Sequence, residues 1–171
     1  NLSVDVKSLE RVFISQNEKQ NRVLYGDILF TTSSETAKEC GYASVVNNHY
    51  LDNNEVYLNS FCFGYRLFNI EKYNVNYFKF LFKSESIRKQ IIKCVNGVTR
   101  FNLSKELFKK IIIPVPHISI QNKIVEILDK LETYTKDIQT GLPLEINQRH
   151  QQYEYYRNKL LDFEKFGGGG N

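Results

Sequence analysis

The chain has 171 residues, of which 42% are apolar and 25% are charged, a composition typical of a globular protein. No apolar run approaches the roughly 20 residues of a membrane span, and the polar start of the chain lacks the pattern of a signal peptide. Cys40, Cys62 and Cys94 are odd in number and far apart, which argues against a disulfide framework and predicts a reducing, cytoplasmic setting.

The net charge of +4 is unevenly distributed along the chain. Residues 1–70 carry 6 basic and 8 acidic groups, residues 71–110 carry 10 and 3, and residues 111–171 carry 7 and 8. The positive excess therefore lies in residues 71–110, which we call the basic block. Such a block on a folded domain indicates a polyanionic partner, although an ordinary solvated helix face has the same composition.

The first part of the chain is typical of β structure, because short runs of apolar and aromatic residues alternate with turn residues. A loop is predicted at 32–41, where the residues are small and polar. Strands are expected at 2–6, at 11–15, at 26–32, at 42–46 as a returning strand, and at 57–69 as a buried strand pair.

Helical spacing begins at residue 74. Apolar residues recur from Tyr77 to Phe82 and again from Ile87 to Ile92, which predicts two helices that meet near 83–85. A loop at 96–104 follows, and then a short helix capped by Ser104. Residues 109–118 are predicted to form a strand that two prolines end.

The last part of the chain predicts two long helices. Apolar residues recur every three or four positions over 119–139, which indicates an amphipathic helix that Ser119 caps. Pro143 opens a second helix, in which Ile146, Tyr153 and Leu160 are seven residues apart, as in a coiled-coil seam.

Together these helices span roughly 60 Å at 1.5 Å per residue, which exceeds the width of a compact domain of about 115 residues. We therefore expect part of them to project and to contact another chain. Packing of the two helices within this chain is the alternative. The predicted fold class is α+β: a mixed, β-sheet-rich domain with short helices at 1–118, a long projecting C-terminal helical (coiled-coil) region at 119–163, and a flexible tail at 164–171.

No strong catalytic pattern is present. The three histidines are far apart, there is no C-x-x-C pair, and the isolated glycines form no phosphate-binding loop. Asp27 with Glu35 and Lys38 is a weak version of a nuclease metal site, but Asp27 directly follows Gly26 and is more simply a turn residue.

Several segments, in this order, resemble the specificity (S) subunit of type I restriction–modification systems. They are a strand with a polar loop, a helical segment, a G-x-T-[QR] loop that leads through an I-P-x-P strand end into a Q-x-x-I-V-x-x-L-D helix, and a final helical region. They read "GDILFTTSSE", "NYFKFLFKSESIRKQI", "GVTRFNLSKELFKKIIIPVPHISIQNKIVEILDKL" and "GLPLEINQRHQQYEYYRNKLLDF". The resemblance covers about Gly26 to Phe163.

Two departures from the family pattern stand out. A full S subunit carries two recognition domains and two helical regions, and this chain has one of each. The recognition domain also begins late, at Asn1, so we expect its N-terminal part to be incomplete. The chain resembles a half-subunit, whether natural, truncated or rearranged.

The resemblance implies that 1–118 is a DNA target recognition domain, which reads one half of a split double-stranded site. It implies that 119–163 is a spacer that docks the methyltransferase subunit and pairs two copies as a homodimer. This chain would perform no chemistry, since S-adenosylmethionine would bind to the adenine methyltransferase subunit and a restriction subunit would cut DNA. The alternatives are a protein-interaction module with a basic patch and a metal-dependent nuclease.

Candidate functional residues follow from these segments, and the polar loops at 31–39 and 96–102 are the expected base readers. Arg100 can hold guanine with two hydrogen bonds, and Asn96 or Asn102 can hold adenine in the same way; for Thr99 and Asn102, loop structure and helix capping are the alternative. The predicted DNA-binding residues are Thr32, Ser33, Ser34, Lys38, Lys83, Arg88, Lys89, Asn96, Thr99, Arg100 and Asn102, with Lys72, Lys79 and Lys93 as further phosphate contacts. The predicted partner or dimer interface is Ile124, Leu128, Leu131, Ile146, Tyr153, Tyr156 and Leu160.

Overall fold

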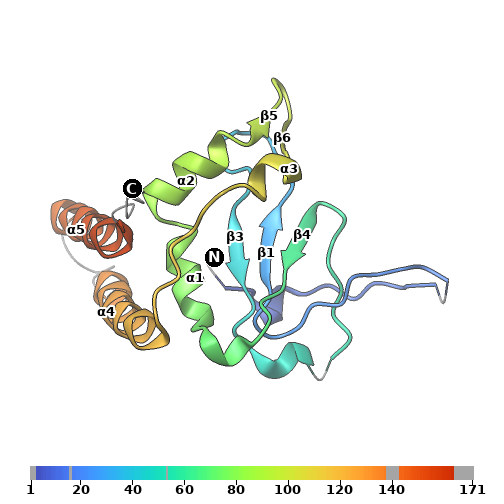
Figure 1. Ribbon diagram of the computed structural model, residues 1–171, viewed down its shortest axis with the longest axis horizontal. Helices are drawn as coiled ribbons and strands as arrows, with labels where there is room; N and C mark the ends of the chain where they lie inside the picture. Colours follow the sequence, from blue (N-terminus) through green and yellow to red (C-terminus); the bar gives the residue numbers. More distant parts are fainter. Residues whose placement is uncertain (1–2, 16, 53, 138–142, 164–171) are drawn as a thin grey trace, which may run out of the picture.

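The computed structural model describes residues 3–15, 17–52, 54–137 and 143–163 (Figure 1). The strands are β1 (Ile28–Thr31), β2 (Ser33–Ser34), β3 (Ala43–Val45), β4 (Cys62–Tyr65), β5 (Val95–Asn96) and β6 (Phe101–Leu103). The α-helices are α1 (Val75–Leu81), α2 (Glu85–Ile92), α3 (Lys105–Phe108), α4 (Ile118–Asp137) and α5 (Pro143–Leu161). Short 3-10 helices lie at Val6–Ser8, His49–Asp52 and Ile70–Lys72. This mixture confirms the predicted α+β class, and the tail predicted at 164–171 lies outside the described residues.

The central sheet has the strand order β3-β1-β4, and both pairs are antiparallel. Leu29 of β1 lies opposite Ser44 on one side and Gly64 on the other. The strands predicted at 26–32 and 42–46 are thus confirmed. Antiparallel pairing of β1 with β3 agrees with the prediction of 42–46 as a returning strand.

Aromatic rings join this sheet to the helices. Phe30 of β1 stacks on Phe63 of β4 at 5.2 Å between centroids and meets Phe82 edge-on at 4.9 Å. Phe108 of α3 contacts both Phe30 and Phe63. Because Phe82 ends α1 and Phe108 ends α3, this cluster fixes both helices on one face of the sheet.

A second, small sheet has the order β2-β6-β5, again antiparallel. β2 follows β1 after a single residue, Thr32, so one continuous stretch of chain contributes to both sheets. This second sheet, with its β5–β6 hairpin, lies at the top of the molecule in the view of Figure 1, above the central sheet.

The helices predicted at 74–95 are present as α1 and α2, and they meet where the sequence placed their junction. The Asn74 side chain caps α1 by accepting a hydrogen bond from the Asn76 amide. Ser104 caps α3 by accepting one from the Leu107 amide, and this cap was predicted. Ser119 does not cap α4, because that helix already begins at Ile118.

Four of the predicted strand regions are corrected. Residues 2–6 and 11–15 form no strand in the part of the chain that is described, and residues 9–15 and 17–20 run outward as an arm with no neighbouring strand (Figure 1). The region 57–69 supplies only β4, not a buried pair. Residues 109–110 form the turn that ends α3, and residues 111–117 belong to no strand, although Ile111 and Ile113 pack on the core and Ile112 faces outward, which reproduces the alternation of a strand.

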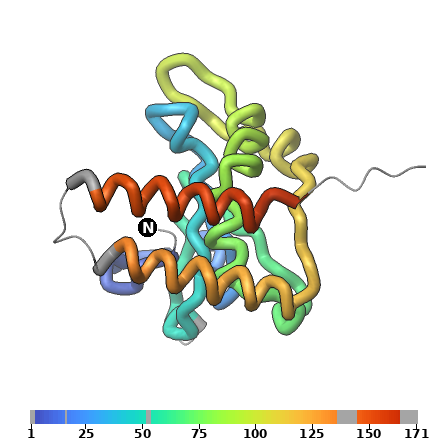
Figure 2. The backbone as a smooth tube through the Cα atoms, turned by 90° about the vertical axis from the view of Figure 1, so that its left-hand side faces the viewer, coloured from blue at the N-terminus to red at the C-terminus, as the bar shows by residue number. Residues whose placement is uncertain are grey.

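Helices α4 and α5 lie side by side and antiparallel across α1 (Figure 2). The buried Gln121 of α4 accepts a hydrogen bond from the Asn74 amide at 3.0 Å and donates one to the Pro116 carbonyl at 2.7 Å. At the other end, Asn158 of α5 accepts a hydrogen bond from the Glu85 amide at 3.1 Å and so caps α2. The helical pair therefore packs on the domain, and the expected projection of part of it as a coiled coil is not confirmed.

Two further observations bear on the composition. Cys40, Cys62 and Cys94 are all free thiols. Among the described helices, none is both long and apolar enough to cross a membrane.

Substitution of Leu128, which is fully buried where α4 meets the domain, tests this packing. Leu128→Ala should lower the free energy of unfolding by about 3 kcal/mol, because it leaves a cavity between α4 and the core. Its neighbour Ile127 is 44% exposed, so Ile127→Ala should cost less than about 1 kcal/mol. Urea unfolding measures both, and equal costs would mean that α4 does not pack as described.

Candidate nucleic-acid interface

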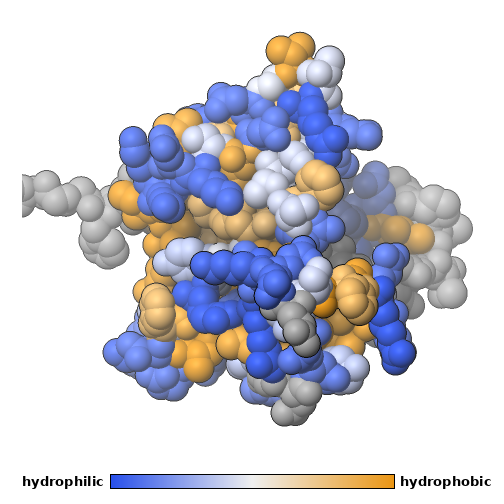
Figure 3. Space-filling view, turned by 90° about the vertical axis from the view of Figure 1, so that its right-hand side faces the viewer, coloured by the Kyte–Doolittle hydropathy of each residue, from blue (hydrophilic) through white to orange (hydrophobic). Residues whose placement is uncertain are grey.

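The β5–β6 hairpin carries one of the two loops that the sequence predicted to read bases, residues 96–102. Gly97 has a φ of 130°, and a Cβ at that position would collide with the Arg100 carbonyl. Only glycine accommodates so tight a turn. The turn leaves Val98, Thr99 and Arg100 exposed, and the tip of the hairpin is apolar with hydrophilic side chains below it (Figure 3).

The other predicted loop, residues 31–39, is joined to this hairpin by strand pairing. Ser33 lies opposite Asn102, and Ser34 lies opposite Phe101. Asn96 in turn lies opposite Asn102 on the far side. The small sheet therefore brings together two loops that are distant in the sequence, and with them six of the predicted DNA-binding residues: Ser33, Ser34, Asn96, Thr99, Arg100 and Asn102.

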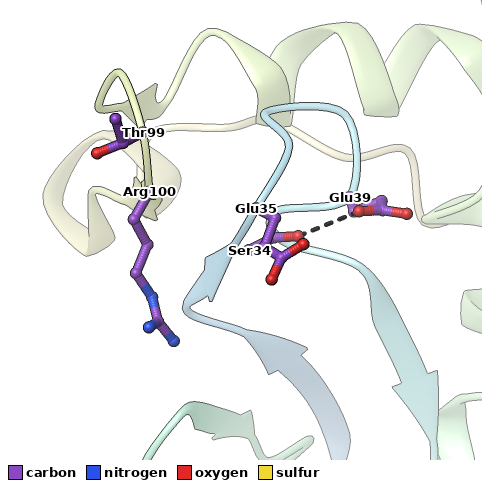
Figure 4. Close-up of a pocket in the computed structure, with 5 residues that line it drawn as sticks. All are labelled: Ser34, Glu35, Glu39, Thr99 and Arg100. Carbon is purple, nitrogen blue, oxygen red and sulfur yellow. Dashed lines mark hydrogen bonds between the residues drawn. The ribbon is translucent and has the colours of Figure 1, made fainter.

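A pocket lies between the two loops. Ser34, Glu35 and Glu39 line it from one side, and Thr99 and Arg100 line it from the other (Figure 4). The Arg100 guanidinium lies 5.6 Å from the centre of the Phe61 ring, a cation–π distance that holds the charge at the rim.

Hydroxyl groups organise the loop 31–39 around Glu39. Thr36 Oγ1 donates a hydrogen bond to Glu39 Oε2 at 2.8 Å, and Ser34 Oγ donates to the same oxygen at 3.3 Å. Thr32 Oγ1 donates to the Phe61 carbonyl at 2.7 Å, so this hydroxyl is occupied within the protein. Ser34 and Thr32 thus have structural bonds, which the sequence alone did not indicate.

Arg88 of α2 fastens the end of the same loop. Its guanidinium donates hydrogen bonds to the carbonyls of Gly41 at 2.7 Å, Lys38 at 2.7 Å and Cys40 at 3.0 Å, and it lies over the Tyr42 ring. Burial lowers the pKa of Arg88 below its ordinary value. The structure thus places this predicted phosphate contact where it positions loop 31–39, while the Lys38 side chain is exposed.

Other cations of the basic block differ in whether they pack against the helical pair or line the surface near α2. Lys79 pairs with Asp129 at 3.1 Å and Glu132 at 2.8 Å and joins α1 to α4, and Lys83 lies 6.0 Å from the Tyr153 ring of α5. The second group lies on α2 and beyond it. Lys89, Lys93 and Lys110 line a groove between α2 and α3, together with Ser86, Gln90, Cys94, Leu107 and Ile111. Lys72 is exposed beside α1.

The predicted partner interface is divided by the fold. Ile124, Leu128 and Tyr153 are buried within the chain, and burial raises the pKa of Tyr153 to about 12. Leu131 and Leu160 pack against the same core, and Ile146 is half-buried. Five of these residues therefore pack within the chain, as the within-chain alternative expects, while Tyr156 remains exposed.

Another set of apolar side chains on the helical pair is exposed to solvent. It consists of Ile120, Ile127 and Tyr134 on α4 with Tyr155 and Tyr156 on α5, and we call this set the outer face. The α4 members are seven residues apart, so their spacing was visible in the sequence. Nothing in that spacing distinguishes it from the buried seam, because both repeat with the helical period.

The geometry does not support the nuclease alternative. Arg66 holds Asp27 with two hydrogen bonds of 2.8 Å, and Asp27 also accepts one from the Leu24 amide. Asp27 is therefore the partner of an arginine at a turn. Within the described ranges, no group of three or more histidine, cysteine or acidic residues is placed to hold a metal ion.

Comparison with known proteins agrees with this arrangement. The chain belongs to the family of the type I restriction modification DNA specificity domain, whose family model matches residues 8–148. It is 34% identical over 152 residues to the putative type I restriction enzyme specificity subunit S.HindORF215P of Haemophilus influenzae, which is 89% of this chain and 36% of that protein. It is 56% identical over 62 residues to the EcoR124I/EcoR124II specificity subunit of Escherichia coli, which is 36% of this chain and 15% of that protein.

These matches confirm the family that the sequence resembled. They also confirm the prediction of a specificity component that is not itself an enzyme. The chain spans about a third of the length of the Haemophilus relative.

Arg88 and its neighbour Lys89 form a matched pair for a test of loop positioning. Arg88→Met should destabilise the protein by about 2 kcal/mol, because three carbonyls lose a charged donor. The amides of Cys40 and Tyr42 should then exchange hydrogen faster. Among the described residues, Lys89 pairs only with the exposed Glu85, so Lys89→Met should cost far less than Arg88→Met and leave loop exchange unchanged. Unchanged exchange in Arg88→Met would contradict the positioning role.

Proposed function

We propose that this chain is the sequence-reading half of a type I restriction–modification specificity subunit, which binds double-stranded DNA and reads one half of a split site. One observation carries the proposal: the β2-β6 pairing joins two polar loops, each predicted from the sequence to contact bases, into one exposed surface. Membership in the DNA specificity domain family supports the same reading.

Base contacts are assigned to the side chains that stay exposed on this surface. Arg100 reads guanine through O6 and N7, and Asn102 or Asn96 reads adenine through N6 and N7. Thr99 and Lys38 are also exposed and extend the surface on either side. Ser33 and Ser34 contribute mainly through backbone pairing, with their hydroxyls close enough to contact bases or phosphates.

Phosphate attraction comes mainly from cations that are not used within the fold. Lys93 is exposed, and Lys89 makes only a surface ion pair. Lys79, Lys83 and Arg88 support the interface indirectly, because they hold the helical pair and loop 31–39 in place. DNA binding should therefore weaken steeply with salt, because binding is favoured by the release of counterions from the phosphates and this release gains less free energy at higher salt.

The helical pair serves assembly in this proposal. Its outer face docks the methyltransferase subunit and pairs two copies of the chain, because tyrosine and isoleucine exposed together are typical of interface cores. A symmetric dimer would read two inverted, identical half-sites. S-adenosylmethionine would bind to the methyltransferase subunit and not to this chain, and a restriction subunit would join the same complex.

Arg100→Ala tests base reading. In complex with the methyltransferase subunit, this variant should lose about 1–3 kcal/mol of affinity for the selected DNA site and relax the preference at one base pair. Lys93→Ala is the matched phosphate variant, and it should weaken all sequences alike and reduce the salt slope by about 1. Competition binding at several salt concentrations separates the two. If Arg100→Ala behaved like Lys93→Ala, Arg100 would be a phosphate contact and not a base reader. Binding that varies little with salt would favour the protein-interaction alternative.

The outer face is tested by an acidic double substitution, Ile127→Asp with Tyr134→Asp. Binding of the methyltransferase subunit or of a second copy should weaken at least tenfold, about 1.4 kcal/mol, while the melting temperature stays near that of the unaltered chain. Ile112→Asp is the control, because this isoleucine is exposed and lies outside α4 and α5. Sedimentation velocity measures both associations, and unchanged association in the double variant would remove the outer face from the proposal.

A further inference from the structure

The pocket between the two loops combines side chains of opposite charge. Glu35 comes from the loop after β2, and Arg100 comes from the β5–β6 turn (Figure 4). Glu35 is exposed, and in the described part of the chain its carboxylate has no hydrogen bond or ion pair, with Arg100 or with any other cation. Glu39 differs, because the hydroxyls of Ser34 and Thr36 occupy it.

An unpaired carboxylate is unfavourable on a surface that binds a polyanion, because the phosphates repel it. It becomes favourable only where the DNA presents hydrogen-bond donors. In the major groove these donors are the amino groups at N4 of cytosine and N6 of adenine, and adenine places the acceptor N7 beside its amino group. Cytosine therefore suits a carboxylate better.

A G·C base pair presents both kinds of partner on one edge. Guanine offers the acceptors O6 and N7, which match an arginine, and its cytosine offers the N4 donor, which matches a carboxylate. We propose that Arg100 and Glu35 together read a single G·C base pair of the half-site, with Arg100 on the guanine and Glu35 on the cytosine of the opposite strand. This inference rests on the proposed function and adds to it the identity of one base pair.

Two neighbours hold the pair in position. The Phe61 ring lies against the Arg100 guanidinium, and its carbonyl accepts the Thr32 hydroxyl and amide. Glu39 binds the hydroxyls on either side of Glu35 and so keeps the loop in the conformation that presents Glu35. Contacts within the protein thus hold Arg100 and Glu35 in position before DNA binds, which lowers the entropic cost of ordering them on DNA.

The test is selection from randomised duplex DNA by the full chain with its methyltransferase subunit. Glu35→Gln replaces the acceptor with an amide that matches adenine. It should reduce the preference for the G·C pair about tenfold at one position of the motif and admit A·T there. Arg100→Ala should relax that same position. Glu106→Gln, an exposed acid on α3 outside the pocket, is the control for charge alone and should leave the motif unchanged.

Three outcomes would overturn the inference. Glu35→Gln would raise the affinity for every sequence alike, as Glu106→Gln does, if Glu35 only repels phosphates. Glu35→Gln and Arg100→Ala would alter different positions if they read separate base pairs. A motif without a G·C pair at the affected position would also refute it. Failure of the unaltered complex to select any motif would refute the proposed function itself, so the two failures are distinguishable.

Discussion

The single residue between β1 and β2 ties the two sheets together. The amide and the hydroxyl of Thr32 both donate to the Phe61 carbonyl, at 2.8 and 2.7 Å, beside β4, while its own carbonyl accepts the Leu103 amide of β6 at 2.8 Å. The Cys40 thiol donates to the carbonyls of Thr32 and Phe101. The β5–β6 hairpin and loop 31–39 are therefore both held at Thr32, which is hydrogen-bonded to β6 and to the residue before β4. The positions of the residues that line the pocket depend on this junction.

The helical pair adds a second constraint, because polar contacts fix it to the domain at several levels. Gln121 meets the start of α1, Lys79 reaches the middle of α4, and Asn158 caps α2 from α5. Such contacts leave little freedom for the pair to swing relative to the small sheet. In the proposed assembly, the outer face would then hold the base-reading surface at a fixed distance and angle from a partner.

Local signals in the sequence were sufficient for the elements that depend on neighbours along the chain. Helices α1 and α2 and the cap by Ser104 follow from spacing within one or two turns. Both loops of the candidate interface were also predicted. Their pairing in one sheet was not, because the pairing of Ser33 with Asn102 produces no local pattern in the sequence. The same limit explains Arg88, whose three carbonyl partners lie on a distant loop, and Phe61, which no motif marked. Residues 111–117 show the reverse error: they were predicted as a strand from their alternation, but alternation alone does not supply a neighbouring strand.

The central claim is that loops 31–39 and 96–102 act as one DNA-reading surface. The most direct measurement is hydrogen exchange of the chain, in complex with the methyltransferase subunit, with and without a duplex that contains the selected site. The account predicts that amides in both loops exchange more slowly when DNA is present. Slower exchange confined to one loop, or confined to the lysine groove between α2 and α3, would contradict it.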